Sequence, residues 1–342
     1  MAILLVAILG ALIPTAFYVL MLWWIDRYEK EPVWLLAVAF LWGAGPAAIM
    51  SVFLELLFDI PVSYLGGAGI LGNLLSASVG APVIEETCKG VALVFLVLFF
   101  RRAFDGVLDG IVYGAMIGFG FAFTENVVAY FVPIMHTQGL GAGLINILLR
   151  TVIFGLNHAL WTGITGAAIG YARLARSRTQ RLLVPVAGWS LAVIMHSLHN
   201  IGATLVQQTL FLSLAFSMLI DWLGILVLGI VVVIELRNQS RWIERGLAEE
   251  VRHGALSEPE YDLLRSATRR SAVHWRARRR AGRSGAQAVM CYFQAATCLA
   301  FKKHYMRTLG DEGGTPAEIE QLRLDLAECR AEAWPFLWPM PT

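Results

Sequence analysis

The sequence predicts an all-α polytopic membrane protein with about seven transmembrane helices and a small helical cytoplasmic region at its C-terminus. Composition is the first observation behind this prediction: 57% of the 342 residues are hydrophobic and only 15% are charged, whereas a soluble domain has about 25% charged residues. The second is that several apolar runs exceed the roughly 20 residues that a helix needs to cross a bilayer. The net charge of +2 is too small to indicate a nucleic-acid partner.

Seven apolar segments account for the predicted transmembrane helices, and the connectors between them alternate in charge. The segments are 3–25, 33–58, 73–100, 107–133, 147–172, 182–206 and 209–236. The odd-numbered connectors and the start of the tail carry Arg27 and Lys30, then Arg101 and Arg102, then Arg173, Arg176, Arg178 and Arg181, then Arg237 and Arg241. The other connectors have no Lys or Arg, and Arg150, near the outer end of the fifth segment, is the exception to the pattern. The positive-inside rule therefore predicts a multi-pass protein of the plasma (inner) membrane, with its N-terminus outside and its tail in the cytoplasm.

Residues 237–342 differ in character from the transmembrane domain, residues 1–236. They hold 17 of the 27 basic and 13 of the 25 acidic residues, so we expect a cytoplasmic domain. The basic run "RARRRAGR" (276–283) is typical of a solvated surface or one that faces lipid headgroups. We expect all four cysteines to be free thiols, because their spacing fits no metal site. They are Cys88, Cys291, Cys298 and Cys329.

Local signals predict that this tail is helical. "SEPE" (257–260) matches a capping box that starts a helix. "TPAEIE" predicts another helix, with Thr315 as its N-cap and Pro316 in its first turn. The segment 285–309 is amphipathic and is predicted to end at Gly310. The tail contains no catalytic motif, and its role stays unassigned.

The predicted spans contain a few charged and amide side chains, which are costly in a membrane and therefore indicate function. They are Glu85, Glu86 and Lys89 in the third span, Glu125 and Asn126 in the fourth, Asn157 and His158 in the fifth, His196, His199 and Asn200 in the sixth, and Asp221 in the seventh. Counted from the cytoplasmic end of each span, most of these groups lie roughly 22–28 Å up. That level is in the outer half of a hydrocarbon layer about 30 Å thick. We therefore expect one shared, water-accessible polar site.

The spacing of these residues agrees with a shared site. Lys89 is four residues after Glu85 and three after Glu86, so it can neutralise or orient either carboxylate. His196 and Asn200 share a helix face in the same way. Pro82 removes a backbone donor near the carboxylates and tends to open the helix to water.

Two chemistries fit this set of residues, and both are hydrolytic. A carboxylate shielded from bulk water can act as a general base, while a histidine–asparagine pair can donate hydrogen bonds to an oxyanion. Alternatively, carboxylates and imidazoles can ligate Zn²⁺, for which Glu125, His158 and His196 are the candidates. An ion- or proton-coupled transporter would also place such groups at mid-membrane, although the sequence has no inverted repeat. A non-catalytic membrane scaffold is the remaining alternative.

Four motifs resemble those of the PrsW family of intramembrane proteases, which is distantly similar to the CAAX prenyl endopeptidases and the bacteriocin-immunity family. "EETCK" matches EExxK, "FAFTEN" contains FxxxEN, and "HSLHN" gives HxxxN. His158 in "NHALWTG" supplies the remaining histidine motif. The resemblance covers roughly residues 15–205 and leaves the tail outside it.

The resemblance implies roles for the site residues. Glu85 would activate water, Glu86 would orient it and Lys89 would neutralise charge. His196 and Asn200 would donate hydrogen bonds to the oxyanion, with Asn126 and His199 in support. Glu125 stands where the CAAX relatives have a histidine, so it is a second base, a metal ligand or a structural partner.

The resemblance also implies the kind of substrate. PrsW-like proteases act on membrane-anchored proteins and are associated with the first cut in anti-sigma factors. The family is described as metalloproteases, which agrees with a zinc site. We therefore expect a membrane-embedded protease that cuts near the extracytoplasmic face of the bilayer.

Overall fold

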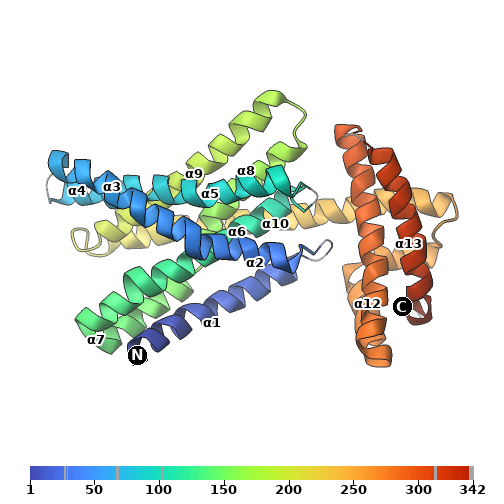
Figure 1. Cartoon of the computed structure of the whole chain (residues 1–342), viewed down its shortest axis with the longest axis horizontal. Helices are drawn as coiled ribbons and strands as arrows, with labels where there is room; N and C mark the ends of the chain where they lie inside the picture. Colours follow the sequence, from blue (N-terminus) through green and yellow to red (C-terminus); the bar gives the residue numbers. More distant parts are fainter. Residues whose placement is uncertain (27, 29, 67–68, 102, 312–313, 339–342) are drawn as a thin grey trace. The chain divides into compact units, whose positions relative to one another are not determined.

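The computed structural model describes residues 1–26, 28, 30–66, 69–101, 103–311 and 314–338, and their regular structure is helical throughout (Figure 1). Arg27 and Arg102 of the predicted charge pattern lie outside these residues. The chain divides into two compact units. The first comprises Met1–Ile25 and Glu31–Val232, and the second comprises Asp26–Lys30 and Val233–Thr342.

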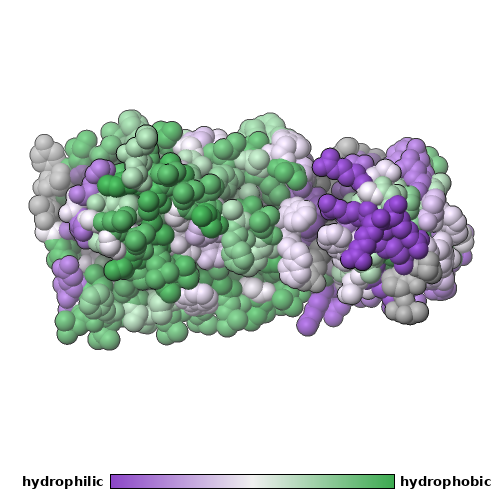
Figure 2. All heavy atoms as spheres, turned by 90° about the horizontal axis from the view of Figure 1, so that it is seen from below, coloured by the Kyte–Doolittle hydropathy of each residue, from purple (hydrophilic) through white to green (hydrophobic). Residues whose placement is uncertain are grey.

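The first unit contains the helices that place the polar residues. In chain order they are α1 (Ala2–Ile25), α2 (Val33–Trp42), α3 (Ala48–Gly66), α4 (Ile70–Leu75), α5 (Ala81–Phe99), α6 (Val107–Glu125), α7 (Val132–Leu148), α8 (Asn157–Leu174), α9 (Arg178–Thr204) and α10 (Leu212–Arg252). Hydrophobic residues cover most of the face of this unit that Figure 2 shows. Large apolar side chains that are more than half exposed in this unit include Phe17, Leu182 and Phe216. Such a surface suits lipid rather than water as the surrounding solvent.

Within the described part of the chain, five helical stretches are long and apolar enough to cross a membrane. They are Ala2–Ile25, Val33–Val62, Val107–Leu174, Arg178–Thr204 and Leu212–Arg252. The prediction of an α-helical, multi-pass membrane protein is therefore confirmed, while the count of seven spans stays a prediction. The predicted third span is not among the five, because three charged residues, Glu85, Glu86 and Lys89, lie close together within it.

The predicted connector 134–146 is mostly helical and lies within α7, in which two helical segments meet at a break in the middle of these residues. Gly139 interrupts it with a φ of 85°, a conformation that glycine adopts at low cost. The helical backbone resumes after this break and ends near Phe154, so the next long helix, α8, begins at Asn157 rather than near residue 147.

Close packing between α6 and α8 depends on glycine. A Cβ added at Gly118 would lie 2.3 Å from the carbonyl oxygen of His158, and one added at Gly110 would lie 2.0 Å from the carbonyl oxygen of Gly166. Small residues four apart let the backbones of membrane helices approach closely. This contact fixes the start of α8, and with it His158, against α6.

Four π-helical turns interrupt the first unit: η1 (Gly43–Ala47), η2 (Ser76–Gly80), η3 (Asn126–Phe131) and η4 (Leu149–Ile153). A π-helical turn bonds residue i to i+5 and disturbs the regular pairing of the backbone. Side chains of other helices bond carbonyl oxygens in three of them: Thr124 Oγ1 donates to Ala44 O at 2.6 Å, Asn200 Nδ2 to Ala77 O at 2.7 Å, and Tyr18 Oη to Thr151 O at 2.8 Å. These contacts stabilise the wide turns within the helix bundle.

The second unit contains the end of α10 together with α11 (Glu258–Leu264), α12 (Ala267–Leu309) and α13 (Thr315–Leu337). The predicted capping box is confirmed, since Ser257 and Glu260 pair at the start of α11. The predicted end at Gly310 is also confirmed, with a φ of 84°. The N-cap of α13 is Gly314 rather than Thr315, because glycine there adopts a φ of 106° that a residue with a Cβ rarely adopts.

The prediction of four free thiols is wrong for two of them. Helices α12 and α13 pack together and bring Cys291 and Cys329 to a Cα–Cα distance of 5.5 Å, where they form a disulfide. This distance is typical of disulfides. Their separation of 38 residues in the sequence gave no sign of the pairing. Cys88, in α5, is a buried free thiol.

Candidate active site

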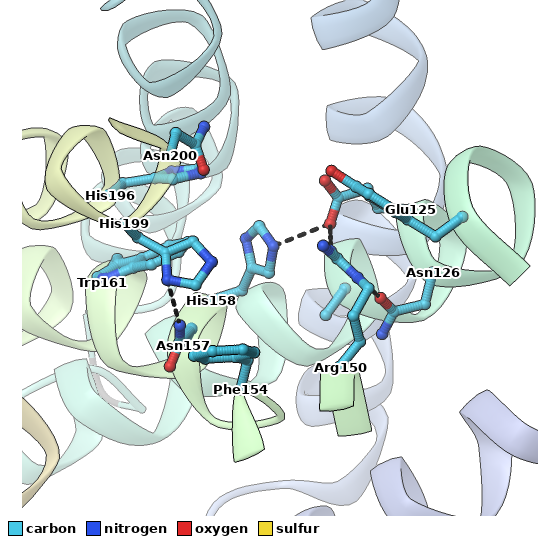
Figure 3. Close-up of a pocket in the computed structure, with 12 residues that line it drawn as sticks. Glu125, Asn126, Arg150, Phe154, Asn157, His158, Trp161, His196, His199 and Asn200 are labelled. Carbon is cyan, nitrogen blue, oxygen red and sulfur yellow. Dashed lines mark hydrogen bonds and ion pairs between the residues drawn. The ribbon is translucent and has the colours of Figure 1, made fainter. Parts of the chain in front are cut away.

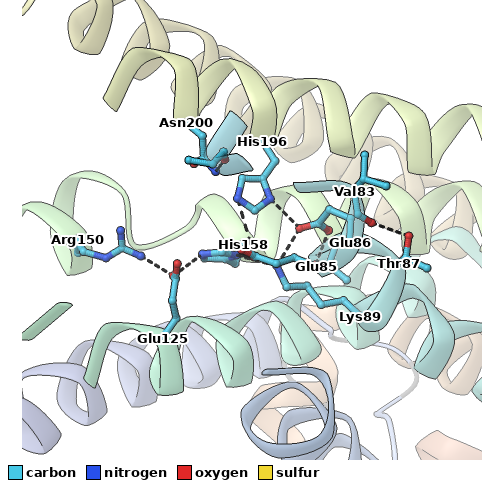
Figure 4. A network of polar contacts seen from close by, with 12 residues as sticks. Val83, Glu85, Glu86, Thr87, Lys89, Glu125, Arg150, His158, His196 and Asn200 are labelled. Carbon is cyan, nitrogen blue, oxygen red and sulfur yellow. Dashed lines mark hydrogen bonds and ion pairs between the residues drawn. The ribbon is translucent and has the colours of Figure 1, made fainter. Parts of the chain in front are cut away.

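Lys89 is fully buried and joins the two glutamates of the α5 motif to α8 (Figure 4). Its Nζ lies 3.0 Å from Glu85 Oε2 and 2.9 Å from Glu86 Oε1. It also lies 3.0 Å from His158 Nδ1 and 3.7 Å from the centre of the Phe121 ring. Because the ammonium group has donors only, His158 Nδ1 accepts this hydrogen bond, and the proton of the neutral ring is on Nε2.

The two glutamates have different surroundings. Glu86 accepts hydrogen bonds from Lys89 and from Thr162 Oγ1 at 3.1 Å, and its Oε1 lies 3.2 Å from His196 Nδ1. Glu85, by contrast, has a hydrogen bond from Lys89 alone among the described residues. Its Oε2 lies 4.0 Å from both His158 Nδ1 and His196 Nε2. Glu85 is therefore the carboxylate with acceptor capacity left.

His196 is held by its neighbours in one orientation. The Trp161 ring stacks on it with a centroid distance of 3.9 Å. Since a carboxylate accepts hydrogen bonds, Nδ1 of His196 donates to Glu86, and Nε2 presents a lone pair towards Glu85. This geometry favours a role for His196 as a metal ligand or a base. The family resemblance instead implies a role as a hydrogen-bond donor to the oxyanion.

Glu125 lies on the opposite side of the His158 ring from Lys89. Its Oε2 accepts a hydrogen bond from His158 Nε2 at 3.0 Å and one from Arg150 Nη2 at 2.5 Å. Arg150 also donates from Nε to Asn126 Oδ1 at 2.5 Å and lies 3.5 Å above the Tyr130 ring. Glu125 thus has a cation of its own, whereas Glu85 and Glu86 share one lysine.

A cavity lies beside Glu125, Arg150 and His158 (Figure 3). Its polar lining comprises Glu125, Asn126, Arg150, Asn157, His158, His196, His199 and Asn200. A volume of about 30 Å³ is enough for a water molecule. Asn200 uses one amide proton on Ala77 O, which leaves the second for a ligand.

His199 forms a second polar cluster at the same cavity. Its Nδ1 lies 2.7 Å from Asp221 Oδ2, and Asn157 Nδ2 donates to the same oxygen at 2.9 Å. Asp221 comes from α10, and its carboxylate is almost fully buried. The cluster joins α8, α9 and α10 within the first unit.

The residues present fit a metal ion. Glu85, His158 and His196 offer ligand atoms that all lie within 4.8 Å of one another, and a Glu and two His is a known set for catalytic zinc. The second nitrogen of each histidine contacts a carboxylate, Glu125 for His158 and Glu86 for His196. Such pairs orient metal-binding histidines. The set expected from the sequence contained Glu125 in place of Glu85, and the structure places Glu125 behind the His158 ring.

The structure brings together the predicted residues of five segments but adds others that sequence reasoning missed. Arg150 appeared in the sequence only as the exception to the charge alternation. Its position eight residues before His158, in an apolar run, was the signal that could have identified it. Thr162 and Trp161 carried no signal, because a threonine and a tryptophan are ordinary residues of a membrane helix.

Comparisons with known proteins identify the family. The model of the PrsW family intramembrane metalloprotease matches residues 31–234. Protease PrsW of Bacillus subtilis (strain 168) is 25% identical over 206 residues, 58% of this chain and 84% of that protein. Protease PrsW of Geobacillus kaustophilus (strain HTA426) is 28% identical over 178 residues, 52% of this chain and 68% of that protein. No solved structure matches the chain. Because the family model covers more than half of the 342 residues, the chain belongs to the PrsW family of intramembrane metalloproteases.

Proposed function

We propose that this membrane protease hydrolyses peptide bonds of membrane-anchored proteins at the site formed by Glu85, His158 and His196. The observation that carries the proposal is the arrangement around Glu85 Oε2, with a lone-pair nitrogen of each histidine 4.0 Å away. One lysine cannot neutralise both glutamates. Glu85 shares its cation with Glu86 and has acceptor capacity left, so in its ionised form it can accept a proton from an attacking water molecule.

The neighbouring residues orient this water and the substrate. Glu86 holds His196, and Glu125 holds His158, so neither ring is free to turn. Asn200 and the guanidinium of Arg150 line the cavity and supply hydrogen-bond donors for the oxyanion that forms on the scissile carbonyl. Alternatively, a zinc ion held by Glu85, His158 and His196 would polarise that carbonyl and acidify bound water, and Glu85 would then be a metal ligand rather than the base.

The substrate class follows from the site's environment. The polar residues are enclosed by membrane helices, and a transmembrane helix hides its peptide bonds within its own hydrogen bonds. The substrate is thus a single-span protein that is unwound or cut beside its span. The charge alternation of the connectors puts the site nearer the extracytoplasmic face, where anti-sigma factors would be cut.

The test is cleavage of a reconstituted single-span substrate by a Glu85→Gln variant. We expect kcat to fall by about 10²–10⁴, the usual contribution of a general base, while the protein still inserts and folds. Asp59→Asn changes an exposed carboxylate of α3 and is the matched control, with activity like wild type. Mass spectrometry of the fragments gives the cut site. Wild-type turnover by Glu85→Gln would refute the role of Glu85, and cuts at the cytoplasmic end would refute the placement.

A further inference from the structure

We propose that His199 is a second catalytic residue, which protonates the leaving amine, and that Asp221 and Asn157 position it. This inference rests on the proposed peptidase function. It starts from a chemical requirement, because the leaving amine must receive a proton, and a second group can deliver this proton while Glu85 holds the one taken from water. An amine anion is too poor a leaving group to depart unprotonated.

Contacts with Asp221 fix the protonation of the His199 ring. A carboxylate oxygen accepts hydrogen bonds, so His199 Nδ1 donates to Asp221 Oδ2 at 2.7 Å. Asn157 Nδ2 donates to the same oxygen at 2.9 Å and holds the carboxylate in place. Asp221 thus fixes which ring nitrogen carries the proton and holds the ring in one orientation, as in other Asp–His pairs that orient a catalytic histidine.

The other ring nitrogen of His199 has no hydrogen-bond partner among the residues that the structure describes. His199 lines the same cavity as His158, His196 and Asn200 (Figure 3). The rings of Phe154 and Trp161 pack against it at centroid distances of 4.9 and 5.5 Å. Nε2 is thus presented to the cavity by a ring that its neighbours hold still.

A purely structural role explains less of this arrangement. Polar side chains do join membrane helices by hydrogen bonds, and an Asp–Asn pair between α8 and α10 would suffice for that. It does not require a histidine whose second nitrogen borders the cavity. The charge also matters, because a carboxylate buried in a membrane is costly unless it is paired, and His199 is the partner that can become a cation.

The proposed step balances. The oxygen of water bonds to the carbonyl carbon, and its proton passes to Glu85. The C–N bond then breaks, the electron pair stays on nitrogen, and this nitrogen takes the proton from Nε2 of protonated His199. Glu85 ends protonated and His199 neutral, and proton exchange with water in the cavity restores both.

The test compares two leaving groups. The probe is a synthetic single-span peptide, in one version with an amide at the scissile position and in another with sulfur in place of the scissile N–H. A thiol has a pKa of about 8.5, so the thiolate leaves without a proton. We expect His199→Gln to slow amide cleavage by about 10²–10⁴ and to leave thioester cleavage close to wild type. His136→Gln changes an exposed histidine of α7 and is the matched control.

Asp221→Asn keeps the shape of the side chain and should show the same selective loss, which decides the question if His199→Gln does not fold. Rates are compared only for variants that elute as the wild type in size-exclusion chromatography. The proposal would be overturned if the folded variants cleave the amide and the thioester with equally reduced rates. It would also be overturned if they cleave the amide as fast as the wild type does. A wild type that cleaves neither probe would instead refute the proposed peptidase function itself.

Discussion

Replacing Lys89 by methionine should destabilise the transmembrane unit strongly, because it leaves two buried carboxylates without their cation. The lysine is fully buried, and its ion pairs with Glu85 and Glu86 are 3.0 and 2.9 Å long. At these separations and an effective dielectric constant of about 20, each pair has a Coulomb energy of roughly 5–6 kcal/mol. Desolvation offsets much of this, and removing one partner of a buried pair typically costs about 3–5 kcal/mol. We expect a loss in this range for Lys89→Met.

The assay is reversible unfolding with SDS in mixed micelles, followed by tryptophan fluorescence. Arg178→Met removes an exposed cation at the start of α9 and should change the free energy of unfolding by no more than about 0.5 kcal/mol. Adding Glu85→Gln and Glu86→Gln to Lys89→Met removes the unpaired charges and should restore most of the loss. If Lys89→Met alone unfolds within about 1 kcal/mol of the wild type, the three side chains do not form the ion pairs described above, and the reasoning is wrong.

Three further predictions concern topology, metal binding and the tail. An alkaline phosphatase reporter inserted at Gly139 should be active, and one fused after Arg237 should be inactive, because the basic connectors face the cytoplasm; an active fusion after Arg237 would contradict the orientation. Lys89→Met should bind Zn²⁺ more tightly than the wild type in calorimetry, because the ammonium group contacts two of the three ligand residues; unchanged or weaker binding would count against the zinc site. Burial would raise the pKa of Glu260, but hydrogen bonds from Arg330 and Ser257 outweigh it and hold that pKa below its usual value. The stability from this carboxylate is therefore present above its unfolded pKa of about 4.3 and lost as pH falls through the folded pKa. In thermal unfolding, Glu260→Gln should therefore lower the melting temperature at pH 7 and matter progressively less as pH falls through that folded pKa; an effect independent of pH would contradict this.

The sequence predicted the membrane class and the residues that meet at the site, because both can be recognised from the order of the residues alone. Long apolar runs identify the helices, and a charge inside such a run has few reasons to be there. The pairing of Lys89 with both glutamates followed from helical spacing alone. The family resemblance then added expected roles, which the spacing did not provide.

What sequence reasoning could not predict depends on how the helices rotate and where they deviate from regular geometry. Whether Glu85 or Glu125 joins the two histidines depends on which side of the His158 ring each one reaches. The helix α7 was missed because its glycines and proline read as a connector, although only Gly139 breaks the backbone. The link from Asp221 to His199 joins two helices, and no spacing rule connects residues 22 positions apart on different helices.

The wide turns that interrupt the helices have a consequence for how proteins of this kind change over time. A π-helical turn contains one residue more than the α-helical turn it replaces. Deleting a single residue from Ser76–Gly80 would therefore restore α-helical pairing. It would also rotate the preceding helical residues about the helix axis by about 100° relative to Glu85. The carbonyl of Ala77 would then no longer meet Asn200. In an alignment of relatives, a one-residue gap within such a helix would mark a rebuilt active site rather than a harmless loop change.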